Sequence, residues 1–580
     1  MNDPGVFPLG VCVLPEPEPN RARTVSYPHY IHEILGHAGV CYETVETGDL
    51  AERLPRLRLL LTVGETELPE ATRTTLRDWV DAGGGWISVG GLCGLEDLLG
   101  ARAEPPAYQG WATGSGTLGE GYLQPVTDSH SISGFLPFPL HFFNGVPVQA
   151  AEASVLAGVR DAHQRPTGRH AVLENRVGQG RCVLIAPDVT GTVVRIQQGI
   201  AVTRDGISAP DGSAPVADGV LKSGDGGVLD WLFDRQPVPG APGLYAFLEP
   251  IADHWRALLL RAIFTLARDL DVALPLLWFY PRNLPALGHL SHDTDNNNPE
   301  RAMRLLAALK AAQVRSTWCV ILPGYERRRI EAIRAAGHEL ALHYDAMAAD
   351  WSEAEFERQG RHLRALFAPE VPVTNKNHYL RWEGDVAFFD WCDRHKILLD
   401  QSKGASKTGE AGFNFGTCHP YFPVAFDGRM IGVMELPTPT QDLEVFAPEA
   451  LRAPLLEAVL EQHGILHLLF HPDHIEKPNV AEALLRSVEE GRARGLEWWT
   501  ARQIATWERA RRQTHWGDYR QENTDITVRL HVETPLEAAT VLWLCRRPAR
   551  LLVDGEGMSV QAVTRWGFDF QALTHTFAQG

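Results

Sequence analysis

Apolar runs and helical patterns alternate along the first part of the chain. Runs with the length of strands covered on both faces of a parallel sheet occur at 11–14, 57–63, 86–89 and 181–186. Between them, apolar positions recur at helical spacing in 30–37 and 69–82, and a Gly-Gly-Gly stop follows the second helix. A longer amphipathic helix over 252–270 closes this segment. The pattern predicts an α/β domain over 1–275.

Two further domains are predicted downstream. Residues 200–245 are rich in Gly, Asp, Ser and Pro and are expected to form long loops. Strand and helix patterns resume at 287 and continue to about 512, which predicts a second α/β domain over 285–512. From 525 the apolar positions alternate with period two, which indicates a small antiparallel β domain, sandwich-like and ancillary, over 520–580.

Charge and composition narrow the classes of partner. The 580-residue chain has a formal net charge of −18, which disfavours nucleic acid or an anionic membrane as the main partner. No apolar run is long enough to cross a bilayer, and the N-terminus does not have the pattern of a secretory leader, so a cytoplasmic location is expected. Eight scattered cysteines without a C-x-x-C pair argue against a zinc knuckle or a disulfide framework.

The residues with the clearest chemistry follow strands of the second domain. Asp293 and Asp295 come after the apolar run 287–290, His343 follows 339–342, and His471 follows 468–470. Because parallel strands bring their carboxyl ends to one rim, we expect these side chains to meet. Carboxylates and imidazoles bind a divalent metal, and a spare carboxylate can act as a base. The same residues have plainer interpretations, since both aspartates could cap the helix that opens near Pro299 and the histidines could be satisfied core residues.

Residues 285–505 resemble the polysaccharide deacetylase superfamily, carbohydrate esterase family 4. The resemblance is carried, in order, by Ser291-His292-Asp293-Thr294-Asp295, the segment 337–343 ending in His343, Asn377-His378-Tyr379-Leu380-Arg381-Trp382, Glu435-Leu436-Pro437 and Leu468-Leu469-Phe470-His471. It implies a distorted (β/α) barrel with seven strands and a divalent metal, most simply Zn²⁺. It also implies that Asp293 is the base, Asp295 and His343 are ligands, and His471 is the acid, with Arg381 holding Asp293 in place.

Two positions depart from the pattern of this family. Thr294 separates two aspartates that are usually adjacent, and Met347 stands where a second ligand histidine is usual. Methionine is a poor ligand for such an ion, so His378 is expected to be the third ligand, with His419 as the second choice. Asp473 or Asp400 could orient His471. The residues expected to contact a sugar substrate are Trp351, Trp382, His419 and Tyr421.

The first domain resembles the class I glutamine amidotransferase-like domains found beside carbohydrate enzymes. The segments 59–63, 79–90 and 177–181 carry this resemblance, which covers about residues 5–270 and implies a flavodoxin-like fold. Active members need a cysteine on a strand-to-helix elbow. Cys93 follows the wrong strand, so the domain is expected to be non-catalytic and to shape the substrate or hold a homo-oligomer together.

Three functional hypotheses remain open. The first is a metal-dependent hydrolase that deacetylates an N- or O-acetylated carbohydrate. The second is an amidohydrolase that acts on a small non-sugar C–N substrate. The third, which Met347 favours, is a catalytically degenerate protein that binds a carbohydrate or serves as a scaffold.

Overall fold

The computed structural model describes residues 7–15, 27–105, 118–205, 219–407, 409–522 and 525–580, and these form two compact units. The first unit comprises Met1–Arg195, His254–Asn283 and Ala510–Gly580, and the second comprises Ile196–Asp253 and Leu284–Arg509. The C-terminal tail therefore groups with the N-terminal segment, and part of the loop-rich segment predicted at 200–245 groups with the central domain. Residues 206–218 of that segment lie outside the described residues.

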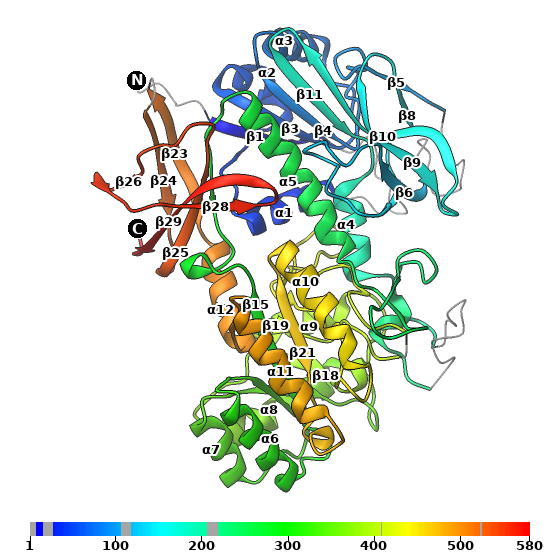
Figure 1. The fold of residues 1–580 in the computed structure, drawn as a ribbon, viewed down its shortest axis with the longest axis vertical. Helices are drawn as coiled ribbons and strands as arrows, with labels where there is room; N and C mark the ends of the chain where they lie inside the picture. Colours follow the sequence, from blue (N-terminus) through cyan, green and yellow to red (C-terminus); the bar gives the residue numbers. More distant parts are fainter. Residues whose placement is uncertain (1–6, 16–26, 106–117, 206–218, 408, 523–524) are drawn as a thin grey trace. The chain divides into compact units, whose positions relative to one another are not determined.

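The first unit is built on a nine-stranded sheet in the order β2-β1-β3-β4-β11-β10-β9-β6-β7. Neighbours from β2 to β11 pair in parallel, and neighbours from β11 to β7 pair antiparallel (Figure 1). In sheet order the strands are Glu43–Thr44, Phe7–Val13, Leu57–Val63, Gly85–Val89, Gly180–Ile185, Pro166–Val177, Ser154–Asp161, Glu120–Pro125 and Leu140–Phe143. Helices α1 (Ile31–Ala38) and α3 (Glu70–Asp81) occupy the predicted segments.

The C-terminal tail forms its sheet with a strand from far upstream. The antiparallel order is β14-β25-β29-β28, formed by Leu274–Leu277, Leu536–Leu544, Phe568–Phe577 and Gln561–Arg565. Strands β23 (His515–Glu522) and β24 (Asp525–His531) form a separate hairpin. Because β14 supplies one edge of its sheet, the tail is not built from its own residues alone.

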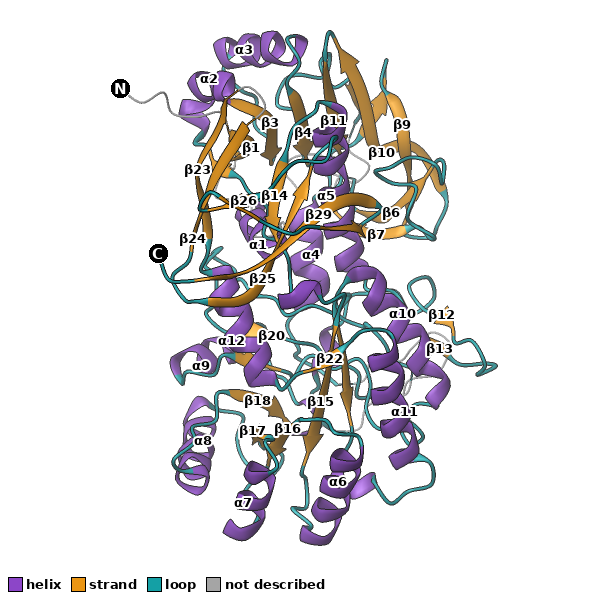
Figure 2. Ribbon diagram, turned by 60° about the vertical axis from the view of Figure 1, so that its left-hand side comes forward, coloured by secondary structure: helices purple, strands orange, loops and turns teal. Residues whose placement is uncertain are grey.

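The second unit contains a curled parallel sheet in the order β20-β19-β18-β17-β16-β15-β21, with β22 also paired to β15. These strands are Met434–Glu435, Leu399–Asp400, Thr374–Asn377, Glu339–Tyr344, Thr317–Val320, Leu287–Asp293, Ile465–Leu469 and Glu497–Trp498. Helices α6 (Pro299–Ala311), α7 (Arg327–Ala335) and α8 (Glu353–Phe367) lie alongside β15 to β18 (Figure 2). The predicted seven-stranded barrel is thus an open one, since among the described residues no hydrogen-bonded pairing joins β20 to β21.

Local sequence explains how β15 and α6 are delimited. All seven residues of β15 are buried, as expected for a strand covered on both faces. Helix α6 begins after Asn298, whose side chain accepts hydrogen bonds from the backbone N–H of Glu300 and Arg301, and Pro299 occupies its first turn. Asn298 is therefore the cap of α6, which leaves Asp293 and Asp295 available for another role.

No helix among the described residues is long and apolar enough to cross a membrane. The first six residues, on which the expectation about a leader partly rests, lie outside the described ranges.

Candidate metal centre

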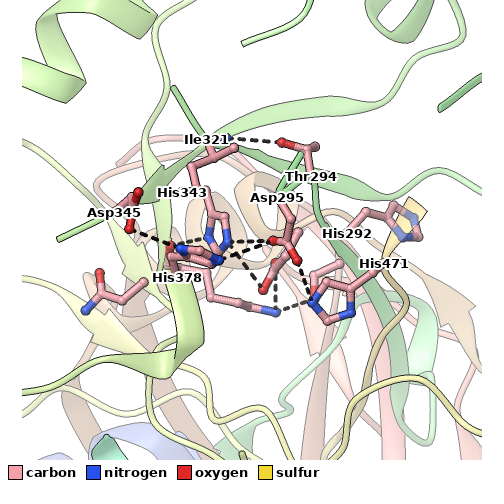
Figure 3. A network of polar contacts seen from close by, with 12 residues as sticks. His292, Thr294, Asp295, Ile321, His343, Asp345, His378 and His471 are labelled. Atoms are coloured by element: carbon pink, nitrogen blue, oxygen red, sulfur yellow. Dashed lines mark hydrogen bonds and ion pairs between the residues drawn. The ribbon is translucent and has the colours of Figure 1, made fainter. Parts of the chain in front are cut away.

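Three strands of the curled sheet in the second unit, β15, β17 and β18, end at one cluster of polar side chains. Asp293 is the last residue of β15, His343 lies near the end of β17, and β18 leads directly into His378. The parallel register sets His343 opposite Lys376 of β18. Figure 3 shows His343 and His378 turned toward Asp295, with His471 approaching that carboxylate from the other side. The convergence expected from the parallel strands is present.

Asp295 lies at the centre of the cluster. Its Oδ1 atom is 3.4 Å from His343 Nε2 and 3.8 Å from His378 Nε2. Its other oxygen, Oδ2, is 3.8 Å from His471 Nε2. The Asp295, His343 and His378 donor atoms all lie within 4.8 Å of one another, a spacing that a single ion could bridge.

Thr294 explains how two aspartates that are not adjacent in sequence reach the same site. Its hydroxyl donates to Asn297 Oδ1 at 2.9 Å and accepts from the N–H of Ile321 at 3.1 Å, so its side chain points away from the cluster. Asp295 then adopts a left-handed backbone with φ of 36°. This region is costly for residues other than glycine and is found where the surrounding structure enforces it. The turn returns Asp295 to the rim beside Asp293.

Three donor atoms of this cluster make no hydrogen bond to any described residue. Asp293 Oδ1, Asp295 Oδ1 and His343 Nε2 are buried and make no hydrogen bond within the described part of the chain. Leaving buried polar atoms unsatisfied is costly. Two carboxylate oxygens and one imidazole nitrogen form a suitable donor set for a divalent cation. These residues therefore fit the metal that the sequence predicts.

The charges in this cluster shift the pKa values of His343 and Asp295 so that the charged form of each is favoured. Burial alone would lower the pKa of His343, but the carboxylates of Asp293 and Asp295 outweigh it and raise that pKa. Burial pushes the pKa of Asp295 upward, yet its contact with His343 and the nearby charges of His471 and His378 bring it below its usual value. Asp295 is therefore ionised at neutral pH, as a metal ligand would need to be.

His378, the residue expected to be the third ligand, is oriented by a carboxylate behind its ring. Its Nδ1 atom lies 3.0 Å from Asp345 Oδ1, so the ring is held with Nε2 toward Asp295. The same Asp345 oxygen accepts the N–H of Met347 at 2.9 Å, and the Met347 side chain is exposed. A carboxylate behind a ligand histidine fixes its tautomer and orientation. Asp345, which the sequence did not single out, thus supports the third ligand position.

We expect Asp345→Asn to weaken metal binding about 10- to 100-fold, the usual cost of losing a carboxylate behind a ligand histidine. The reason is that an amide cannot hold the His378 ring by a charged contact. Titration of the metal-free protein with Zn²⁺ measures the effect. Asp350→Asn is the matched control, because Asp350 is exposed in the same loop and makes no ion pair among the described residues. Equal affinities in the two variants would contradict a role for Asp345.

Asp442 takes the position behind His471. It contacts His471 Nδ1, accepts the His471 backbone N–H at 2.8 Å, and lies 2.8 Å from His474 Nδ1. Burial lowers the pKa of His471, but the charge and hydrogen bond of Asp442 outweigh it and raise that pKa to about 9. The two carboxylates suggested by the sequence lie elsewhere. Asp473 pairs with Arg301, and Asp400 accepts from Asn375 and Ser402.

Lys376, rather than Arg381, lies beside Asp293. Its Nζ atom is 3.7 Å from Asp293 Oδ1 and donates to Ser291 Oγ at 2.6 Å. The guanidinium of Arg381 instead contacts Glu383 and the carbonyl oxygen of Ala346. Arg381 thus anchors the loop after β17, and the cation that faces the predicted base comes from a fully buried lysine.

The residues predicted to contact a substrate are not brought to the cluster. Trp382 and Tyr421 are fully buried, and their polar atoms donate to the carbonyl oxygens of Asp385 and Gln197. Trp351 packs on neighbouring aromatic rings, and His419 Nε2 bonds to the Gln462 carbonyl. Aromatic residues near a motif can belong to the core as well as to a cleft.

One aromatic residue that the sequence did not select is exposed next to the cluster. Tyr379 follows His378, is 53% exposed, and has its ring centroid 4.6 Å from that of His378. A backbone φ of 59° turns it outward.

Comparison with known proteins gives similarity to solved structures only. Neither a family model nor a curated protein sequence matches the chain. The "putative polysaccharide deacetylase" of Mycobacterium smegmatis is 20% identical, with a TM-score of 0.33, over 42% of this chain and 96% of that chain. Puue allantoinase is 15% identical, with a TM-score of 0.32, over 39% and 91%. The "probable polysaccharide deacetylase" of Pseudomonas aeruginosa PAO1 is 15% identical, with a TM-score of 0.32, over 40% and 93%.

Proposed function

We propose that the protein is a metal-dependent hydrolase that removes acetyl groups from an N- or O-acetylated carbohydrate. The observation that supports this most is the cluster of Asp293, Asp295, His343, His378 and His471 at one rim. Within it Asp293 Oδ1, Asp295 Oδ1 and His343 Nε2 are buried and make no hydrogen bond among the described residues. A bound cation, for which Zn²⁺ suits this mixed oxygen and nitrogen set, polarises the scissile carbonyl and lowers the pKa of water to about 7.

Each protein group then has a chemical task. Asp295, His343 and His378 hold the ion. Asp293 accepts the proton of the attacking water, and the Lys376 ammonium faces that carboxylate at 3.7 Å. His471 lies across Asp295 and donates a proton to the departing amine or alcohol. Its raised pKa, about 9, keeps it protonated at neutral pH.

The substrate class is inferred from the surroundings of the ion. Tyr379 is 53% exposed beside His378. The Lys222 ammonium lies over its ring at 5.5 Å, and the part of the ring that stays exposed can pack on a pyranose. A separate acid, His471, and a separate base, Asp293, suit an amide or ester bond whose leaving group needs a proton. The complete set of groups favours an enzyme over the degenerate binding protein, since His378 supplies the ligand that Met347 does not.

The first unit is proposed to play a supporting part. Cys93, the one cysteine there in a glycine-rich turn, is fully buried, and burial raises the pKa of its thiol to about 12. A buried thiol that stays protonated is a poor nucleophile. We therefore retain the proposal of an amidotransferase-like domain without amidotransferase activity, which shapes the substrate or holds a homo-oligomer together.

The test combines metal content with substrate choice in the full chain. The protein is stripped with a chelator, reloaded with Zn²⁺, and assayed for acetate release from chito-oligosaccharides and acetylated esters, and for hydrolysis of small cyclic amides. We expect one ion per chain and acetate release that depends on it. Preference for the cyclic amides would support the amidohydrolase instead. Sugar binding without metal or hydrolysis would support the degenerate protein and end the proposal.

A further inference from the structure

The first unit contains a cavity of about 710 Å³ that is separate from the metal centre. Four segments line it: the β10–β11 hairpin, the end of α5 (Ile251–Asp269), the end of β25 and the start of β29. All the lining residues belong to the first unit. Its volume is in the range of sites that hold small molecules.

Arginines dominate the polar lining of this cavity. The lining includes Arg176, Arg181, Arg268 and Arg546 but only two aspartates, Asp269 and Asp569. This excess of positive charge is found in a chain whose formal net charge is −18. A cavity lined with positive charge in an acidic protein attracts anions.

Two of the four arginines are already neutralised. Arg181 is buried and pairs with Glu174 and Asp269. Arg268, in the last turn of α5, pairs with Asp269 at 3.0 Å and lies where a cation offsets the helix dipole. These two residues therefore contribute mainly to the fold of the site.

Arg176 and Arg546 are the spare cations. Both are exposed, and neither makes an ion pair or side-chain hydrogen bond within the described residues. Arg176 stands directly opposite Arg181 in the antiparallel hairpin. Like charges at such a position destabilise a sheet. Glu174 of the same hairpin and Asp269 balance the charge of Arg181. Arg176 is therefore the member of this pair that has no counter-ion among the described residues, and an anion in the cavity would supply one.

We propose that this cavity binds a small molecule that carries a phosphate group, held by Arg176 and Arg546. A phosphate offers three acceptor oxygens, so it can bond to two guanidinium forks at once. The cavity is larger than one anion requires, and Leu270, Leu544 and Phe568 provide an apolar wall for the remainder of the molecule. The site goes beyond the proposed deacetylase function and does not depend on it.

Binding is tested by calorimetry on the full chain with inorganic phosphate, a nucleoside diphosphate and citrate, all at matched ionic strength. We expect both phosphate-bearing probes to bind, and Arg176→Gln and Arg546→Gln each to weaken binding about tenfold or more, since each removes a charge-assisted hydrogen bond. Arg547→Gln is the control, because Arg547 is an exposed neighbour that does not line the cavity. Binding should survive removal of the metal from the other unit.

The unliganded variants give an independent readout. Arg176→Gln should keep or raise the melting temperature of the free protein, because it removes the repulsion with Arg181. Three results would each overturn the proposal: no binding of either phosphate probe, equal weakening by Arg547→Gln, or citrate binding as tightly as phosphate. A lowered melting temperature for unliganded Arg176→Gln would also count against it, because Arg176 would then stabilise the fold.

Discussion

Asp293→Asn is expected to lower kcat about 1,000-fold while the protein still binds one metal ion. The amide cannot accept the proton that the carboxylate takes, and the loss of a general base typically costs between about 10² and 10⁴ in rate. The neighbouring Lys376 would remain in place, since it also donates to Ser291. Rates of acetate release and metal content on the same preparation measure the two effects separately.

Asp295→Ala is the contrasting variant for this experiment. Asp295 contacts three histidines of the cluster, so its removal should weaken metal binding by more than the roughly 10- to 100-fold typical of supporting residues. Asp473→Asn serves as a neutral control, because Asp473 pairs with Arg301. If Asp293→Asn turned over within tenfold of the unmodified protein, or lost its metal as Asp295→Ala does, Asp293 would not be the base.

Asp442→Asn is expected to move the alkaline limb of the pH–rate profile toward neutral pH. Asp442 is the main group that raises the pKa of His471 to about 9 against the effect of burial. The acid is active when protonated, so activity in the unmodified protein should persist from neutral pH and fall as pH rises through about 9. Without the carboxylate, burial opposed only by the more distant charges of Asp295 and Asp293 should lower the pKa of His471 toward neutral pH.

The loss in this variant should therefore depend on pH. At pH 8 we expect kcat to fall about 100-fold, within the usual range for a general acid, and the deficit should shrink as pH falls toward 6. A bound cation would weaken the contribution of Asp295 to the pKa of His471, but it leaves the contact with Asp442 unchanged. His474→Gln is the control, since His474 also contacts Asp442. An unchanged alkaline limb in Asp442→Asn would remove His471 as the acid.

In the second unit, the sequence predicted the strands that contain continuous apolar runs. Continuous apolar residues mark the start of β15 and most of β17. Because parallel strands place their carboxyl ends together, the sequence predicted that Asp293, His343 and His471 lie near one another. The alternative in which Asp293 and Asp295 cap α6 is wrong, because Asn298 is the cap and asparagine caps a helix as well as aspartate does.

The supporting residues could not be predicted in the same way. Lys376 lies in β18, a strand of Thr, Asn, Lys and Asn that is buried throughout but has the composition of a surface loop. Asp442 belongs to an irregular segment 29 positions before His471, and only the tertiary fold brings them together. Likewise β14 joins a sheet formed by residues more than 250 positions later, a pairing that no local pattern encodes.

A metal ion bound at the ends of β15, β17 and β18 would stabilise the fold of the second unit. An ion held by Asp295, His343 and His378 would cross-link three strands that are otherwise joined by backbone hydrogen bonds and side-chain packing. Its binding energy would add to the resistance of the second unit to unfolding, by about 2.7 kcal/mol when free ion exceeds its dissociation constant a hundredfold. The ion supply of the surroundings would then regulate the lifetime of the folded protein as well as its chemistry.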